Sequence, residues 1–202
     1  MRTRPAREEE GELRIGRSHH LARVLIVLCV LILPAFLSLG CGGDDEGGTD
    51  TVLRHPEDFL PPGTEGMPEN GNPSTATDAD GLREIVNGGW QIYTNNGFRE
   101  MVEQLYSGTV GGTSATIQVW IMDVETSENA ASLQEELTAE STWENAGVIG
   151  DEDHRLTSLF AYTILFRREG YSVQVEISTG TQDSKDLAVL FATHIDGEIT
   201  RS

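Results

Sequence analysis

The chain has 202 residues and is strongly acidic, with a formal charge of −19. Residues 41–202 hold 29 of the 33 acidic residues but only 8 of the 14 basic ones, a formal charge of −21. A surface of this sign repels nucleic acid phosphates and anionic lipid headgroups, so we predict that the protein binds no nucleic acid. The acidic surface would keep the protein soluble, or attract cations or a basic partner.

An apolar run of 16 residues, 24–39, follows an arginine-containing segment at the start of the chain. As a helix it would span about 24 Å, less than the ~30 Å hydrocarbon core of a bilayer. A basic segment, a short apolar run and small residues before a cleavage point are typical of a secretory signal peptide. We therefore predict a signal peptide over residues 1–40, with an uncleaved helical anchor as the alternative.

Cys41 follows this run after a single glycine, Gly40, in the sequence LSLGCGG. The stretch resembles a bacterial lipobox, which implies transfer of a diacylglyceryl group to the Cys41 thiol and cleavage between Gly40 and Cys41. An intramolecular disulfide is excluded for the mature chain, because cleavage removes Cys29, the other cysteine. The predicted location is the bacterial cell envelope, lipid-anchored and facing away from the cytoplasm, on either the inner or the outer membrane.

Residues 41–77 are rich in Gly, Pro, Asp, Glu and Asn and contain few apolar side chains. Such a composition cannot bury a core, so we predict a flexible tether that holds the domain away from the membrane. Phe59 and Leu60 are an exception, and we expect them to dock on the domain. Residues 78–202 would form that domain.

The first half of the domain predicts one helix and two strands. The helix begins at an N-cap, Asp78 or Asp80, and stops at residues 95–97. Strands follow over residues 98–108 and 115–124, and the second is apolar on both faces, so we expect it to be central and covered on both sides. The residues on the apolar helix face are Leu82, Ile85, Val86, Gly89 and Tyr93.

The second half predicts a helix capped by Ser127 and ending near Trp143, a short strand and turn over 147–155, a hairpin over 160–178, and a last helix over 182–199. Together the elements indicate a single α+β domain, with three helices and an antiparallel sheet of about five strands. The expected apolar side of the last helix consists of Leu187, Leu190, Phe191, His194 and Ile195.

Part of the domain resembles a known group of proteins. The stretch LREIVNGGWQIYTNNGF combines a helix, an Asn-Gly-Gly turn, a tyrosine and a Gly-Phe pair. It resembles an uncharacterised bacterial domain family of secreted proteins and lipoproteins, over roughly residues 58–199. The resemblance implies no activity, because none is assigned to the family. The matching residues are Asn87, Gly88, Gly89, Tyr93, Gly97 and Phe98.

The sequence offers few groups for catalysis or metal binding. It contains no His-x-x-x-His, no Glu-x-x-His, no Gly-x-Ser-x-Gly and no Walker loop. The run Asp-Glu-Asp-His at 151–154 could hold a cation, but four adjacent strand residues cannot all point at one ion. We therefore predict no metal and no cofactor.

Two glycines interrupt the first predicted helix, where each costs about 1 kcal/mol relative to alanine. Gly88 and Gly89 would either let the helix pack closely on the sheet or expose backbone to a ligand. The latter interpretation predicts a ligand site at Asn87, Gly88, Gly89 and Trp90. The tryptophans at 90, 120 and 143 could line a cleft or fill a core.

The sequence thus predicts a membrane-anchored envelope lipoprotein that acts as a non-catalytic binding or accessory module. Its partner would be an envelope protein or a small ligand. The alternative is an extracytoplasmic hydrolase or cation-dependent enzyme. A pocket gathering Asn87, Trp90 and an acid with His194 would favour an enzyme or a ligand binder, and a filled core with only surface carboxylates would favour a scaffold.

Overall fold

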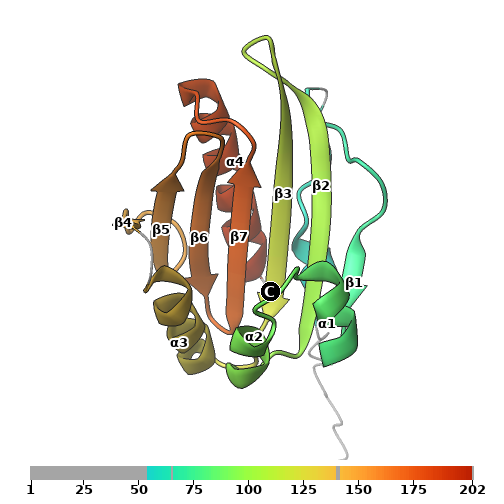
Figure 1. Cartoon of the computed structure of the whole chain (residues 1–202), viewed down its shortest axis with the longest axis vertical. Helices are drawn as coiled ribbons and strands as arrows, with labels where there is room; N and C mark the ends of the chain where they lie inside the picture. The colour runs from blue at the N-terminus through green and yellow to red at the C-terminus, as the bar shows by residue number, and fades with distance from the viewer. Residues whose placement is uncertain (1–53, 65, 140–141, 202) are drawn as a thin grey trace, which may run out of the picture. The chain divides into compact units, whose positions relative to one another are not determined.

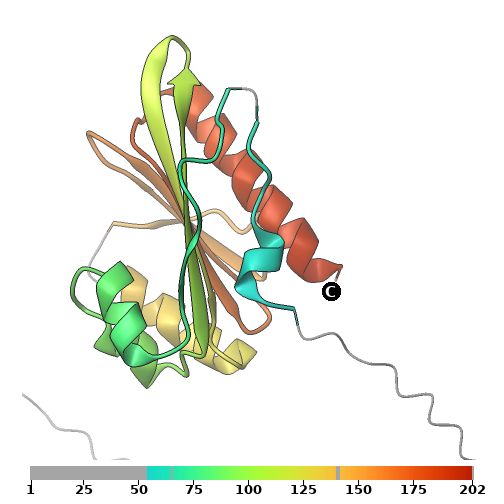
Figure 2. The ribbon, with the colours of Figure 1, turned by 90° about the vertical axis from the view of Figure 1, so that its right-hand side faces the viewer.

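The computed structural model describes residues 54–64, 66–139 and 142–201. They form one antiparallel sheet in the order β1-β2-β3-β7-β6-β5-β4, with helices on both faces (Figures 1 and 2). The predicted α+β class is confirmed, but the described chain has seven strands rather than about five and four α-helices rather than three. The unpredicted edge strands, β1 (Ser74–Ala76) and β4 (Glu144–Asn145), are too short to show a periodicity.

Two hairpins build the centre of the sheet. β2 (Glu100–Val110) and β3 (Thr113–Asp123) pair along their whole length, across a turn in which Gly111 and Gly112 have positive φ. β6 (Tyr162–Arg168) and β7 (Tyr171–Ile177) form the second hairpin, as predicted. β7 pairs with β3, and β5 (Glu152–Thr157) pairs with β6.

The two faces of β3 contribute to two separate cores. Ile117, Val119 and Ile121 are fully buried beneath α4, whereas Met122 and Val124 face the other three helices. β3 is therefore central, as predicted, but it is covered on both sides only at its Met122–Val124 end, because Gln118 and Trp120 remain partly exposed. Figure 2 shows α4 against one face of the sheet and α1, α2 and α3 against the other. The helices are α1 (Ala79–Ile85), α2 (Gln91–Asn95), α3 (Ser127–Thr138) and α4 (Gln182–Thr200).

The first predicted helix is in fact two helices. Asp78 caps α1, since its Oδ1 accepts a hydrogen bond from the backbone N–H of Gly81 at 2.8 Å. The break before α2 comes from Gly88 and Gly89, whose φ values of 96° and 66° do not occur in a right-handed helix. No atom lies within 4 Å of a Cβ built at either position. Close packing on the sheet, one of the two interpretations above, is therefore wrong, because the glycines make the turn.

α3 and α4 lie where the sequence predicts them, with differences in detail. Thr126 rather than Ser127 caps α3, and α3 ends at Thr138 rather than near residue 143. Leu190 is 66% exposed and His194 is exposed too, so these two residues of the predicted apolar side do not face the sheet. α4 packs on the sheet through a stripe of residues next to the predicted one. The small side chains of Ala188 and Ala192 allow close approach there. That buried stripe is Ser184, Ala188, Phe191, Ala192, Ile195 and Ile199.

The folded domain begins earlier than residue 78, because residues 54–64 and 66–77 pack on it instead of forming a tether. The 3-10 helix η1 (Pro56–Phe59) buries Phe59 completely, with its ring 5.1 Å from that of Tyr171, which confirms the predicted docking. Arg54 Nη1 donates to the backbone carbonyl of Glu198 at 3.0 Å. A few large side chains, among them Phe59 and Arg54, thus hold a segment of polar composition on the domain. The predicted signal peptide, Gly40, Cys41 and the rest of the tether lie outside the described residues.

A polar contact also joins this segment to β2. His55 Nδ1 lies 2.7 Å from Glu100 Oε2, and this hydrogen bond, helped by the negative charge of Glu100, raises the pKa of His55 above 6.5. We expect an NMR titration of the His55 ring to show the raised pKa, and the Glu100→Gln variant to lower it. Because the folded-state pKa is the raised one, the contact stabilises the domain fully below pH 6.5 and is lost as pH rises through the folded-state pKa. An identical titration in Glu100→Gln would contradict this assignment.

Candidate functional site

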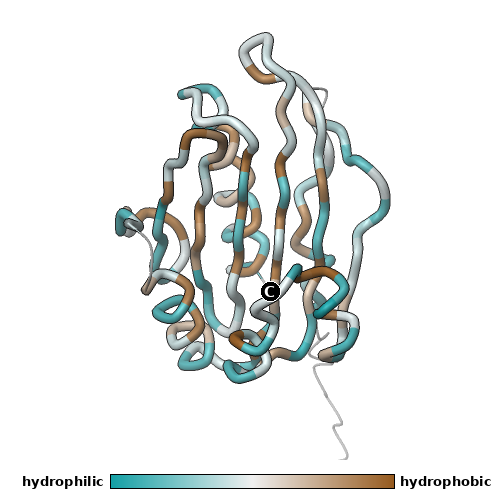
Figure 3. The backbone as a smooth tube through the Cα atoms, in the orientation of Figure 1, coloured by the Kyte–Doolittle hydropathy of each residue, from teal (hydrophilic) through white to brown (hydrophobic). Residues whose placement is uncertain are grey.

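Helices α1, α2 and α3 cover only one end of their face of the sheet, and the rest of that face is open (Figure 1). Side chains two residues apart along a strand share a face. The alternation of hydrophobic and hydrophilic positions along the strands can be followed in Figure 3. We define the open sheet face as Glu103, Leu105, Gln118, Trp120, Thr163, Leu165, Gln174 and Glu176. Thr163 and Leu165 are buried among their neighbours, and the other residues of the open sheet face are partly exposed.

Hydrogen bonds between side chains hold the open sheet face in place. Glu103 Oε1 accepts from Trp120 Nε1 at 3.0 Å and also from Gln118 Nε2. Thr163 Oγ1 donates to Glu176 Oε2 at 3.1 Å. These bonds fix the orientation of both carboxylates and of the indole before anything binds.

The strand register arranges these side chains in two adjacent rows. Trp120 stands opposite Glu103 on one side and Gln174 on the other. In the next row, Gln118 stands between Leu105 and Glu176. The tryptophan is therefore flanked by a carboxylate and an amide, with a second amide and a second carboxylate one row away.

The Trp120 row borders the helices. Tyr93 of α2 and Leu137 of α3 line a crevice together with Trp120, Leu165 and Gln174. The helices form the wall of this crevice and the sheet forms its floor. Burial raises the pKa of Tyr93, so its phenol is neutral at physiological pH.

The predicted ligand site lies at the turn between α1 and α2. Asn87, Gly88 and Gly89 are exposed, and Trp90 is half-buried with the guanidinium carbon of Arg83 5.4 Å from its ring centroid. The turn itself accounts for both glycines, and ligand binding by residues 87–90 stays a prediction. His194 belongs to α4 on the opposite face of the sheet, so the sequence-based test for an Asn87, Trp90 and His194 pocket is negative.

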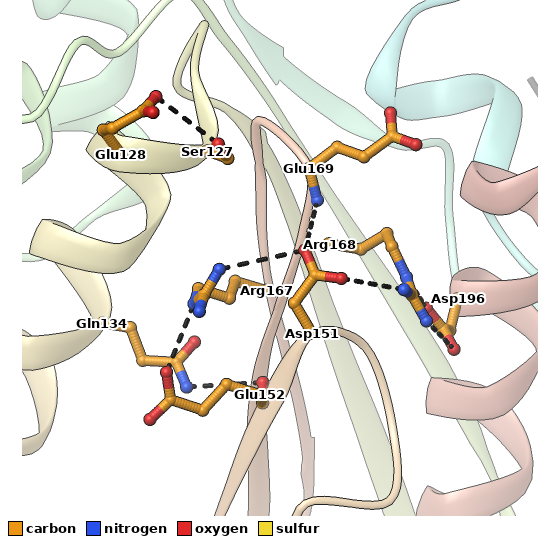
Figure 4. Close-up of polar contacts among 9 residues, drawn as sticks. All are labelled: Ser127, Glu128, Gln134, Asp151, Glu152, Arg167, Arg168, Glu169 and Asp196. Carbon is orange, nitrogen blue, oxygen red and sulfur yellow. Dashed lines mark hydrogen bonds and ion pairs between the residues drawn. The ribbon is translucent and has the colours of Figure 1, made fainter.

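The acidic run at 151–154 is occupied by structural contacts. Arg168 bonds Asp196 through Nε and Nη2 and bonds Asp151 through Nη1 at 2.8 Å (Figure 4). Glu152 accepts from Arg167 Nε at 3.3 Å. Asp151 and Glu152 therefore tie the start of β5 and the turn before it to the end of β6, and Arg168 links this end of β6 to Asp196 of α4.

The remaining members of this run point in opposite directions. Asp153 is fully buried in the core beneath β5, while His154 lies on the other side of the strand and bonds Glu152 Oε1 at 2.9 Å. The hydrogen bond with His154 is the main reason that the pKa of Glu152 is lowered. Nowhere in the described ranges do three or more His, Cys, Asp or Glu side chains form a group able to hold a metal ion.

An exposed apolar pair marks the turn between β5 and β6. Leu159 and Phe160 are 92% and 81% exposed, so Phe160 belongs to the turn and not to the hairpin strand predicted from residue 160. Ser158 Oγ accepts from the backbone N–H groups of Phe160 and Ala161, which fixes the turn. The pair borders a cavity of about 580 Å³ lined mainly by hydroxyl-bearing side chains and glycine.

The sequence interpretation missed most of the open sheet face. It left Trp120 as a residue of either a cleft or a core, and this residue both contacts the α1–α3 core and remains partly exposed. Glu103, Gln118, Gln174 and Glu176 look like the ordinary solvent side of three strands. The available signal was the recurrence of Gln and Glu on that side of β2, β3 and β7, but a single sequence does not contain the register that aligns them.

No protein-family model matches the chain, and no curated protein matches it. A similar solved structure is the extracellular domain of PknH from Mycobacterium tuberculosis, at 12% sequence identity and a TM-score of 0.42. The match covers 69% of this chain and 87% of that one. A likeness this distant assigns no function. Within the part of the chain that the structure describes, no helix has both the length and the apolar character needed to cross a bilayer.

Proposed function

We propose that the protein is a lipid-anchored module of the bacterial cell envelope that binds a ligand on the open sheet face and catalyses no reaction. The observation that carries the binding role is a set of polar side chains left uncovered by the helices and held in place by their own hydrogen bonds. A few oriented polar groups beside an aromatic ring are typical of ligand sites.

The arrangement of the acids supports binding over hydrolysis. β3 separates the strands that carry Glu103 and Glu176, and the two residues stand in different rows. Each of these carboxylates accepts hydrogen bonds from neutral donors, and His154 is engaged by Glu152. The groups that the described chain offers on this face are therefore suited to holding a ligand rather than to moving protons.

The envelope location rests on the sequence. The lipobox resemblance at Gly40 and Cys41 predicts a diacylglyceryl anchor, and the apolar run before it is short for a spanning helix. The acidic surface also repels anionic lipids and nucleic acids, which argues against either of them as the ligand.

Photo-crosslinking in the native cells tests the binding role. We expect a p-benzoylphenylalanine at position 174 to form a light-dependent adduct, seen as a mass increase of the purified protein. Position 190 is the matched control, because Leu190 is exposed but belongs to α4 on the other face of the sheet. No adduct at 174, or the same adduct at both positions, would refute ligand binding by the open sheet face.

A further inference from the structure

We infer that the ligand of the open sheet face is a saccharide without negative charge, bound with one sugar ring against Trp120. This inference rests on the proposed binding role and adds the chemical class of the ligand.

Trp120 provides a fixed apolar surface within a polar surround. Its Nε1 donates to Glu103 at 3.0 Å, so the one polar atom of the indole is already satisfied and the ring orientation is set. The ring remains partly exposed. A pyranose ring presents a face of C–H groups that packs on an aromatic ring, and the hydroxyl groups at its edge then reach the polar side chains around Trp120.

The hydrogen-bonding groups still free on this face call for a ligand rich in donors. Glu103 Oε2 and Glu176 Oε1 take no part in the bonds described above. The amide of Gln174 has no hydrogen-bond partner among the described residues, and it can both accept and donate. Each sugar hydroxyl donates one hydrogen bond and accepts others, which matches two carboxylate acceptors beside an amide.

The charge on this face selects against anionic sugars. Glu103 and Glu176 repel uronic acids, sugar phosphates and nucleotides. Arg167, the cation on the same side of β6, is paired with Asp151 and Glu152 and does not offset them. A neutral sugar or an amino sugar meets no such penalty.

A basic peptide is the competing ligand, and the backbone argues against it. The peptide groups of β3 are paired with β2 on one side and β7 on the other. A peptide lying across the open sheet face would find only side chains for its own backbone groups, whereas extended peptides gain affinity by pairing with a sheet edge. A saccharide carries its hydrogen-bonding groups at its periphery and needs no backbone partner.

Calorimetric titration of the full-length protein, in a detergent without a sugar headgroup, tests this inference. The probes are cellotetraose, tetra-N-acetylchitotetraose and maltotetraose as uncharged saccharides, tetragalacturonate as an anionic one, and tetralysine as a basic peptide. We expect at least one uncharged tetrasaccharide to bind and tetragalacturonate not to bind. Co-sedimentation with isolated cell walls, competed by the bound tetrasaccharide, distinguishes a wall polysaccharide from a free oligosaccharide as the natural source.

Variants then locate the site. Trp120→Ala should raise the Kd about tenfold or more. Gln174→Ala removes a side chain without internal hydrogen bonds and should raise the Kd about fivefold in a protein that folds normally. Phe160→Ala removes a more exposed aromatic ring away from the site and should change the Kd by less than about twofold.

The outcomes separate the two proposals. Binding of tetralysine alone, weakened in Glu103→Gln, would overturn the saccharide and replace it with a basic peptide. Saccharide binding that survives both Trp120→Ala and Gln174→Ala would also overturn it. If no probe binds at millimolar concentration while the adduct at position 174 persists, the saccharide is wrong and the binding role stands. If no probe binds and the adduct at position 174 is missing too, both the saccharide and the binding role are wrong.

Discussion

Replacing Asp153 by alanine is expected to lower the free energy of unfolding by about 3 kcal/mol. The side chain is fully buried, and Oδ1 accepts from the backbone N–H groups of Val148 and Ile149 at 2.6 and 3.2 Å. Oδ2 accepts from Arg155 Nε at 3.1 Å. Alanine would leave two backbone donors without an acceptor and would remove the carboxylate partner of Arg155. Urea denaturation followed by tryptophan fluorescence measures the loss.

Two further variants show whether the burial of Asp153 is responsible for the loss of stability in Asp153→Ala. Asp80 pairs with Arg83 at 3.5 Å but is 91% exposed, so Asp80→Ala should cost less than about 0.5 kcal/mol. Asp153→Asn keeps an oxygen for the backbone donors and should fall between the two alanine variants. Equal stability of Asp153→Ala and Asp80→Ala would show that the buried carboxylate does not organise the turn before β5.

The second large effect is expected at Cys41. In wild type, mass spectrometry of the N-terminal peptide should find residue 41 as the first residue, carrying a diacylglyceryl group. Two or more acyl chains, at about 0.8 kcal/mol per buried CH₂, give stable membrane attachment. The Cys41→Ala variant has no thiol to receive the lipid, so its N-terminal peptide should carry no added lipid mass.

Cys29 offers a matched control for this experiment. It is the other cysteine of the chain and lies within the apolar run that cleavage would remove. Cys29→Ala should therefore keep both the cleavage and the lipid. A wild-type protein that retains residues 1–40 would instead support the uncleaved helical anchor.

Elements with a strong local pattern could be predicted from the sequence. The β6–β7 hairpin alternates apolar residues on both strands around a charged turn, and β3 is apolar on both faces. The segment 66–76 has no such pattern. It follows β2 through backbone bonds, for example from Asn70 N to the Leu105 carbonyl at 2.8 Å, and backbone bonds leave no trace in the order of side chains.

The candidate site could not be predicted because it depends on long-range pairing. Glu103 and Gln174 are 71 positions apart, and they flank Trp120 only because β3 lies between β2 and β7 in one register. A shift of one residue in either pairing would send every side chain that the shifted strand contributes to this face to the opposite face. Similarly, α4 has two overlapping apolar stripes, and only packing on the sheet selects the one containing Ala188 and Ala192.

The attachment of η1 has a mechanical consequence. Any pull on the chain before residue 54 enters the domain through Arg54, which holds Glu198 near the end of α4, and through Phe59 in the core beneath that helix. The load falls first on contacts at the α4 side of the sheet. The surface around Trp120 lies on the opposite side, so tension in an anchored chain would reach it only after η1 had come away.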